Sequence, residues 1–203
     1  MYLTYNKNEK YVIHELLEKY IFKGYKNGFF VDVGAHDGKS INNTLYFEEN
    51  NNWTGVNIEP IKEVYNDLLI NRPNCININC AVCNKDGTTN FICNTGWTEM
   101  ISGIKDTMDD RHIQRLLKEN HQHGSTSQII EVETKKIETI CDNHKISHIN
   151  LLSIDVEGGE FEVIKSINFD KVYIDVIVFE NNYDDTCIPI IKYLNEKNYI
   201  LIY

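Results

Sequence analysis

The chain has 203 residues, of which 42% are hydrophobic and 25% charged, a length and composition that suit one folded domain and exclude a disordered chain. No apolar run approaches the roughly 20 residues of a membrane span, and the polar N-terminus has no signal-peptide core, so we expect a cytoplasmic protein without a membrane partner. The net charge of −10, with Lys and Arg scattered, argues against nucleic acid as a partner.

Apolar runs alternate with amphipathic stretches along the chain, the pattern of βαβ units around a mostly parallel sheet. In chain order we expect strands at 29–33, 53–59, 75–80, 88–93, 129–133, 149–154, 172–179 and 199–202. We expect helices at 9–23, 41–50, 61–71, 107–119, 136–144, 160–166 and 185–195. The sequence thus predicts an α/β protein with a Rossmann-like fold, a single domain over residues 1–203 with a helical segment in 1–25.

Residues 94–127 are polar, contain glycine and are rich in histidine. This segment is too long for a plain loop in a compact domain, so we expect a functional insertion that forms a lid and holds the helix at 107–119. Trp97, Glu99 and Met100 are expected to shape an acceptor pocket, or else to plug the sheet.

The loop after the first long strand reads VDVGAHDGKS over residues 31–40. A phosphate-binding P-loop needs one more residue between its glycines, and a dinucleotide loop needs glycine where His36 stands. S-adenosylmethionine has no phosphate to cradle, and its sulfonium and ammonium groups suit acidic neighbours. The spacing of Asp32, Gly34 and Gly38 therefore favours this cofactor, with Asp32 balancing its positive charge. A tight turn without a ligand is the alternative.

Glu59 ends the next strand, about twenty residues after the glycine loop. An acidic residue at this strand end can accept hydrogen bonds from both ribose hydroxyls of a nucleoside. NAD sites also have such a residue, so it does not by itself distinguish the two cofactors. Cys80 and Ala81, at the end of the third strand, would flank the adenine, or are an ordinary strand end.

Carboxylates gather after two later strands: Asp155, Glu157 and Glu160 after the strand at 149–154, and Glu180 after the strand at 172–179. Ligands bind outside the carboxyl ends of parallel strands, so these side chains should face the transferred group, with Asp155 nearest. Of these, Asp155, Glu157 and Glu180 could hold Mg²⁺. Nothing in their spacing demands it, so Mg²⁺ is possible but not favoured, and we expect no metal site.

At this point the sequence resembles the FkbM family of methyltransferases. The resemblance covers about residues 29–183, through VDVGAHDGKS with INNT after it, WTGVNIEP, NRPNCININCAV, WTEMISGI, HIQR, LSIDVEGGEFEVI and VIVFENNY, in that order. It implies a class I methyltransferase fold and O-methylation, often of a hydroxyl on a sugar, glycan or glycosylated metabolite. The family's fold generally continues into a further edge strand, whereas this chain stops at Tyr203. We therefore expect a reduced edge of the sheet and an incomplete lid.

The family pattern carries over cofactor residues and active-site residues. Asp155 and Glu157 are the active-site residues that it implies. Asn43 and Thr44 match the helix start beside the cofactor. The full cofactor-binding set that we expect is Asp32, Gly34, Ala35, His36, Asp37, Gly38, Asn43, Glu59, Cys80, Ala81 and Asp155.

Methyl transfer is an in-line displacement from a sulfonium, so the main task is to position the acceptor oxygen. A sugar hydroxyl gains roughly 10²–10⁴-fold in rate from a general base. The candidates are Asp155, Glu157 and a histidine of the insertion. Asp155 and His112 are favoured, whereas His121 and His123 suit a solvated loop. A non-catalytic cofactor-binding module or subunit stays open as an alternative, as does an NAD-dependent oxidoreductase.

Overall fold

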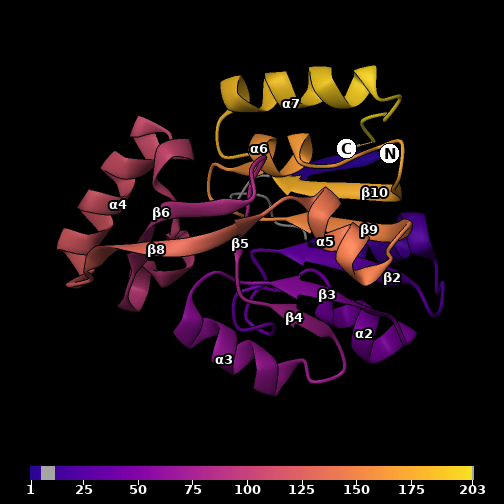
Figure 1. The fold of residues 1–203 in the computed structure, drawn as a ribbon, viewed down its shortest axis with the longest axis horizontal. Coiled ribbons are helices and arrows are strands. Elements are labelled where there is room, and N and C mark those ends of the chain that lie inside the picture. The colour runs from indigo at the N-terminus through magenta and orange to yellow at the C-terminus, as the bar shows by residue number, and fades with distance from the viewer. Residues whose placement is uncertain (6–11, 203) are drawn as a thin grey trace.

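Six parallel strands form the central sheet, in the order β1-β10-β9-β2-β3-β4 (Figure 1). The computed structural model describes residues 1–5 and 12–202. The strands are β1 (Tyr2–Tyr5), β2 (Phe29–Val33), β3 (Thr54–Ile58), β4 (Ile76–Ile78), β9 (His148–Ile154) and β10 (Tyr173–Glu180). The strand order reverses between β2 and β9, and this switch point is where open α/β sheets bind their ligands.

Helices cover both faces of this sheet. On one face α5 (Ile137–His144), α6 (Glu160–Lys165) and α7 (Asp184–Glu196) contribute to the larger core cluster. On the other, α1 (Ile13–Leu16), the π-helical turn η1 (Leu17–Phe22) and α2 (Leu45–Asn51) pack through aromatic and aliphatic side chains. The central strands are therefore buried on both faces, which explains why they appear in the sequence as nearly continuous apolar runs.

A second sheet of four strands stands beside the first, in the order β5-β8-β6-β7 (Figure 1). Its strands are β5 (Ala81–Val82), β6 (Gly87–Asn94), β7 (Gly103–Ile104) and β8 (Ser127–Lys135). The strand predicted at 75–80 is β4, but it is shorter than predicted, because the chain leaves the first sheet after Ile78. The Asn79 amide fixes this exit by donating to the main-chain oxygens of Glu59 (2.8 Å) and Pro60 (2.9 Å).

The segment 94–127, predicted as an insertion, connects β6 to β8 of this second sheet. It contains the 3₁₀ turns η2 (Gly96–Ile101) and η3 (Lys105–Thr107), β7 and the helix α4 (Asp110–His123). The helix begins later than the predicted 107–119, because Asp109 is its N-cap and accepts a hydrogen bond from the Arg111 N–H (2.8 Å). It ends at His123, and the following Gly124 caps it with a left-handed φ of 69°.

Other helix boundaries also differ from the sequence predictions. The helix predicted at 41–50 begins at Leu45, because the Asn42 side chain accepts the N–H groups of Thr44 (3.0 Å) and Leu45 (2.9 Å) and holds the preceding residues in a turn. Of the helix predicted at 9–23, residues 9–11 lie outside the described part, and the rest is α1 and η1. The helix α3 (Lys62–Asn71) lies close to its predicted bounds.

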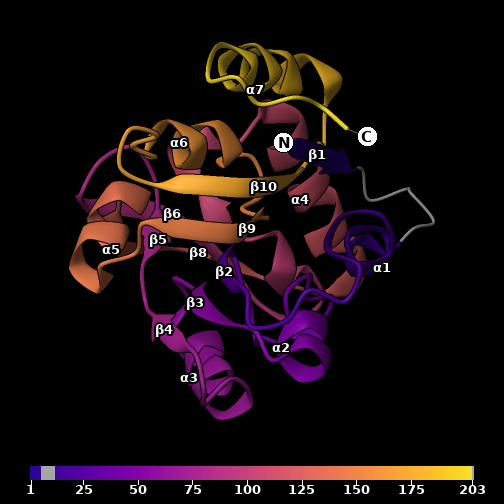
Figure 2. The ribbon, with the colours of Figure 1, turned by 90° about the vertical axis from the view of Figure 1, so that its right-hand side faces the viewer.

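The edge of the central sheet beside β10 is occupied by β1, which the sequence analysis does not predict. Figure 2 shows β1 next to β10, with both labelled chain ends close to it. The strand predicted at 199–202 is reduced to a single parallel bridge between Leu201 and Tyr2. Among the described residues, no helix has the length and apolar character needed to cross a membrane.

Candidate active site

A cavity of about 890 Å³ lies at the carboxyl ends of β2, β3, β9 and β10. It is at the switch point of the sheet, and η2 and α4 contribute to its wall. Among the predicted site residues, those that line it are Asp32, Gly34, Ala35, His36, Asn43, Glu59, Cys80, Ala81, Asp155 and Glu157. Three predicted site residues, Asp37, Gly38 and His112, are not among its lining residues.

Gly34 brings the loop after β2 into direct contact with the end of β9. Its φ is +83°, and a β-carbon built on it would lie 1.9 Å from the main-chain oxygen of Asp155. The N–H groups of Gly34 and Ala35 both donate to Ile58 O, at 3.0 and 3.1 Å. No other residue type fits at Gly34, so only glycine lets the loop pack this closely against the end of β9.

Asp32 lines the cavity but also anchors the polypeptide that follows the loop. Its Oδ2 accepts hydrogen bonds from Thr44 Oγ1 (2.8 Å) and Asn42 Nδ2 (2.9 Å). Burial raises the pKa of Asp32. This carboxylate therefore fixes the start of α2 at the rim of the cavity, in addition to the ligand contact that the sequence predicts.

The buried Arg72 supports this loop through hydrogen bonds. No local pattern in the sequence indicates this role. Its Nη1 donates to Gly38 O (3.0 Å) and Asn42 Oδ1 (3.1 Å), its Nη2 donates to Thr44 Oγ1 (3.1 Å), and it pairs with Glu48. The role expected for Gly38 needs correction. A β-carbon there would lie 2.6 Å from Arg72 Cγ, so glycine makes room for the arginine beneath the loop.

Asp37 also has a role inside the loop. Its carboxylate accepts the N–H groups of Lys39 (2.8 Å) and Ser40 (2.7 Å) and the Ser40 hydroxyl (2.7 Å). These bonds close a tight Asx turn. The carboxylate that the sequence analysis assigns to the cofactor is thus used to shape the loop.

Glu59 is buried at the end of β3 and lines the cavity. Its Oε2 accepts the His36 N–H (3.1 Å) and its Oε1 accepts the Ile61 N–H (2.8 Å). Burial raises the pKa of Glu59 to about 7. Two main-chain donors therefore hold this carboxylate in one orientation beside the glycine loop.

His36 connects the glycine loop to the η2 turn. Its φ of 51° is left-handed, and its Nε2 lies 3.1 Å from Glu99 Oε1. Trp97 and Met100 line the cavity with Glu99. The ring of Trp97 stacks on His123, with centroids 4.7 Å apart.

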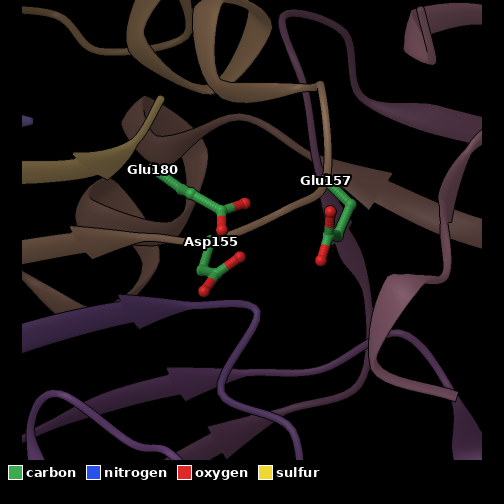
Figure 3. A group of neighbouring side chains, drawn as sticks. All are labelled: Asp155, Glu157 and Glu180. Carbon is green, nitrogen blue, oxygen red and sulfur yellow. The ribbon is translucent and has the colours of Figure 1, made fainter. Parts of the chain in front are cut away.

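Three carboxylates, which we call the acidic trio (Asp155, Glu157 and Glu180), point toward one another in the cavity (Figure 3). One oxygen of each lies within 4.8 Å of one oxygen of the others. Asp155 follows β9, Glu180 ends β10, and Glu157 lies in the turn before α6 with a left-handed φ of 57°. A strained non-glycine backbone of this kind is concentrated at functional sites.

Each member of the trio faces another protein group. The Tyr5 hydroxyl donates to Asp155 Oδ2 (3.1 Å), His112 Nδ1 lies 3.6 Å from Glu157 Oε2, and Asn182 Nδ2 donates to Glu180 Oε2. Arg115 of α4 also lines the cavity, where its charge interacts with Glu157 and Glu180. The sequence analysis missed Tyr5, which lies on a short strand in a polar segment, and assigned no role to Arg115.

The position of His112 corrects the expectation that it faces the acceptor. Its side chain is only 2% exposed and lies behind Glu157, with Nε2 3.4 Å from Ile101 O. His112 and Leu116 are the buried side chains of α4, whereas Arg115 lines the cavity. A base must come within hydrogen-bond reach of the proton it accepts, and the geometry favours Asp155 and Glu157 for this.

The family model described as "Methyltransferase FkbM domain" matches residues 32–201. The chain belongs to the FkbM methyltransferase family. It is therefore a methyltransferase, and its α/β fold is the class I methyltransferase fold of that family. Comparisons with curated proteins and with solved structures give no match. The FkbM match begins inside β2, so β1 and α1 lie outside it.

Proposed function

We propose that this FkbM methyltransferase transfers a methyl group from S-adenosylmethionine to a hydroxyl oxygen of a sugar, glycan or glycosylated metabolite. One observation carries the proposal: the carboxylate of Asp155 lines the same cavity as the glycine loop, at the switch point of the sheet. The family implies the methyl donor, and the residues of this cavity fit it.

The fit rests on the chemistry of the cavity wall. Gly34 lets the glycine loop pack against the main chain of Asp155, and Glu59 offers an oriented carboxylate for a pair of hydroxyls. The buried side chains of Cys80 and Ala81 add apolar surface to the cavity wall. Residues Asp32, Ala35, His36 and Asn43 complete the set that would hold the cofactor. When bound, it supplies a methyl group on a positively charged sulfur.

The role of the protein is then to position and activate the acceptor oxygen. Asp155 accepts the proton of the acceptor hydroxyl at a carboxylate oxygen while the acceptor oxygen becomes the nucleophile. Such a base contributes roughly 10²–10⁴-fold. Glu157 and Arg115 line the same space and orient the acceptor by hydrogen bonds. The η2 turn, joined to the loop by the contact between His36 and Glu99, excludes water.

The test is methyl transfer by the Asp155→Asn variant, measured as S-adenosylhomocysteine release with a panel of free sugars, glycosides and oligosaccharides. We expect kcat to fall about 100-fold or more, with an unchanged dissociation constant for S-adenosylmethionine by calorimetry. The matched control, Asp142→Asn, changes a carboxylate on α5 outside the cavity lining and keeps wild-type activity. Wild-type kcat in Asp155→Asn, or binding of NAD in place of S-adenosylmethionine, contradicts the proposal.

A further inference from the structure

β1 brings a tyrosine into the active-site cavity. Tyr5 lines the cavity, and in the strand register it is the partner of Glu180. Its hydroxyl donates to Asp155 Oδ2 at 3.1 Å. Because Tyr5 lies outside residues 32–201, the family match assigns it no role.

The position of Tyr5 is set from two sides. Its main-chain oxygen accepts the Asn181 N–H at 2.7 Å, which ties the end of β1 to the end of β10. Its hydroxyl accepts a hydrogen bond from Asn43 Nδ2 (3.4 Å), and the same amide donates to Ser153 Oγ (3.3 Å). The phenol is therefore held between β9 and the residues before α2.

The phenol acts as a donor toward Asp155. Burial, followed by the charges of Asp155 and Glu180, raises the pKa of Tyr5 well above its usual value near 10. The hydroxyl therefore keeps its proton throughout the neutral range. A hydrogen bond from a neutral hydroxyl to a carboxylate is charge-assisted, which makes it stronger and more directional than one between two neutral groups.

One oxygen each of Glu157 and Glu180 lies within 4.8 Å of an oxygen of Asp155, and repulsion between like charges at this distance disfavours a fixed orientation of the Asp155 carboxylate unless a donor holds it. We propose that Tyr5 is a positioning residue of methyl transfer, whose hydroxyl holds the Asp155 carboxylate in the orientation that accepts the proton of the acceptor. This inference rests on the proposed function of Asp155. It makes β1, at the edge of the sheet, a part of the active site.

Tyr2 provides a matched control on the same strand. It is buried, and its hydroxyl donates to Asn195 Oδ1 (3.2 Å), a residue of α7 outside the cavity lining. Tyr2→Phe and Tyr5→Phe each remove one oxygen from β1. If Tyr5 only held the strand in place, the two variants would have the same effect on the rate of methyl transfer.

The experiment is a double-mutant cycle on Tyr5→Phe and Asp155→Asn, with the single-turnover rate of methyl transfer as the readout. We expect Tyr5→Phe to lower this rate about tenfold, because the charge-assisted bond to the carboxylate is lost. We expect Tyr5→Phe to lower the melting temperature no more than Tyr2→Phe does. Its dissociation constant for S-adenosylmethionine should match that of the wild type. In the Asp155→Asn background, Tyr5→Phe has no further effect on the rate, because the two residues act as a unit.

The outcomes separate this inference from the proposed function. Wild-type rates in Asp155→Asn overturn the role of Asp155, and with it that of Tyr5. If Asp155→Asn is inactive but Tyr5→Phe keeps the wild-type rate, only the role of Tyr5 is overturned. Equal rate losses in Tyr5→Phe and Tyr2→Phe, or a Tyr5→Phe loss that multiplies with that of Asp155→Asn, also overturn it.

Discussion

A β-carbon on Gly34 would lie 1.9 Å from the main-chain oxygen of Asp155, so the cofactor loop and the proposed base touch through their backbones. A second link joins the same two strand ends, because Asp155 N–H donates to Val33 O at 3.0 Å. The loop that would hold the methyl donor and the carboxylate that would receive the proton are thus parts of one rigid unit. Methyl transfer needs this rigidity, because its rate depends on the relative position of donor and acceptor.

The first prediction concerns Gly34→Ala. We expect this variant to lose measurable binding of S-adenosylmethionine and to unfold at lower urea concentration, since the added carbon forces the ends of β2 and β9 apart. Gly124→Ala is the control, because Gly124 also has a left-handed φ (+69°) but no atom within 4 Å of its β-carbon position. Its cost is confined to backbone strain, about 1 kcal/mol. Equal urea midpoints for the two variants would show that the contact with Asp155 is unimportant.

The second prediction concerns Arg72, the buried cation beneath the loop. Arg72→Met leaves Glu48 without its ion-pair partner, so we expect a loss of about 3–5 kcal/mol in the free energy of unfolding. Arg111→Met removes an arginine whose side chain is 47% exposed in its pairs with Asp109 and Asp185, and should cost much less unfolding free energy than Arg72→Met. Urea denaturation of both variants measures the difference. A loss for Arg72→Met as small as that for Arg111→Met refutes the structural role of Arg72.

The third prediction is a pH dependence of stability in the ligand-free protein. Burial raises the pKa values of Glu59 and Glu160 to about 7. Each carboxyl therefore binds its proton more tightly in the folded chain than in the unfolded one. The resulting stability is fully present below the unfolded value near 4.5 and is lost as the pH rises through about 7.

The check uses Glu59→Gln and Glu160→Gln, with the exposed Glu131→Gln as control. Between pH 5 and pH 8 we expect the wild type to lose unfolding free energy relative to each of the two buried variants, and to keep a constant difference from Glu131→Gln. A wild-type advantage that instead grows with pH would mean that these carboxyls are held ionised.

The fourth prediction concerns metal dependence. Each carboxylate of the acidic trio already faces a protein group, from Tyr5, His112 or Asn182. We therefore expect methyl transfer to continue at an unchanged rate after EDTA treatment, and Mg²⁺ to leave the melting temperature unchanged. The opposite result is a loss of activity that Mg²⁺ restores, and it would assign the trio to a cation.

Local patterns in the sequence were sufficient for the parts of the fold whose signals are short-range. The strands β2, β3, β9 and β10 are apolar runs with a glycine or an acidic residue at or just after their ends, so these ends could be located and the carboxylates there assigned to one edge of the sheet. The glycine loop could also be identified from the sequence, because its spacing excludes phosphate-binding loops. These features require no knowledge of which segments pack together.

Other features of the site could be found only in the tertiary structure, because they depend on contacts between residues that are distant in sequence. Tyr5 reaches Asp155 only because β1 pairs with β10, and Arg72 acts on Gly38 only because α3 packs beneath the loop. The burial of His112 depends on which face of α4 packs inward. The sequence of this helix does not show whether the side with His112 faces the core or the cavity. Hydrophobic periodicity specifies the elements, whereas the positions of single polar side chains follow from long-range packing that no local pattern encodes.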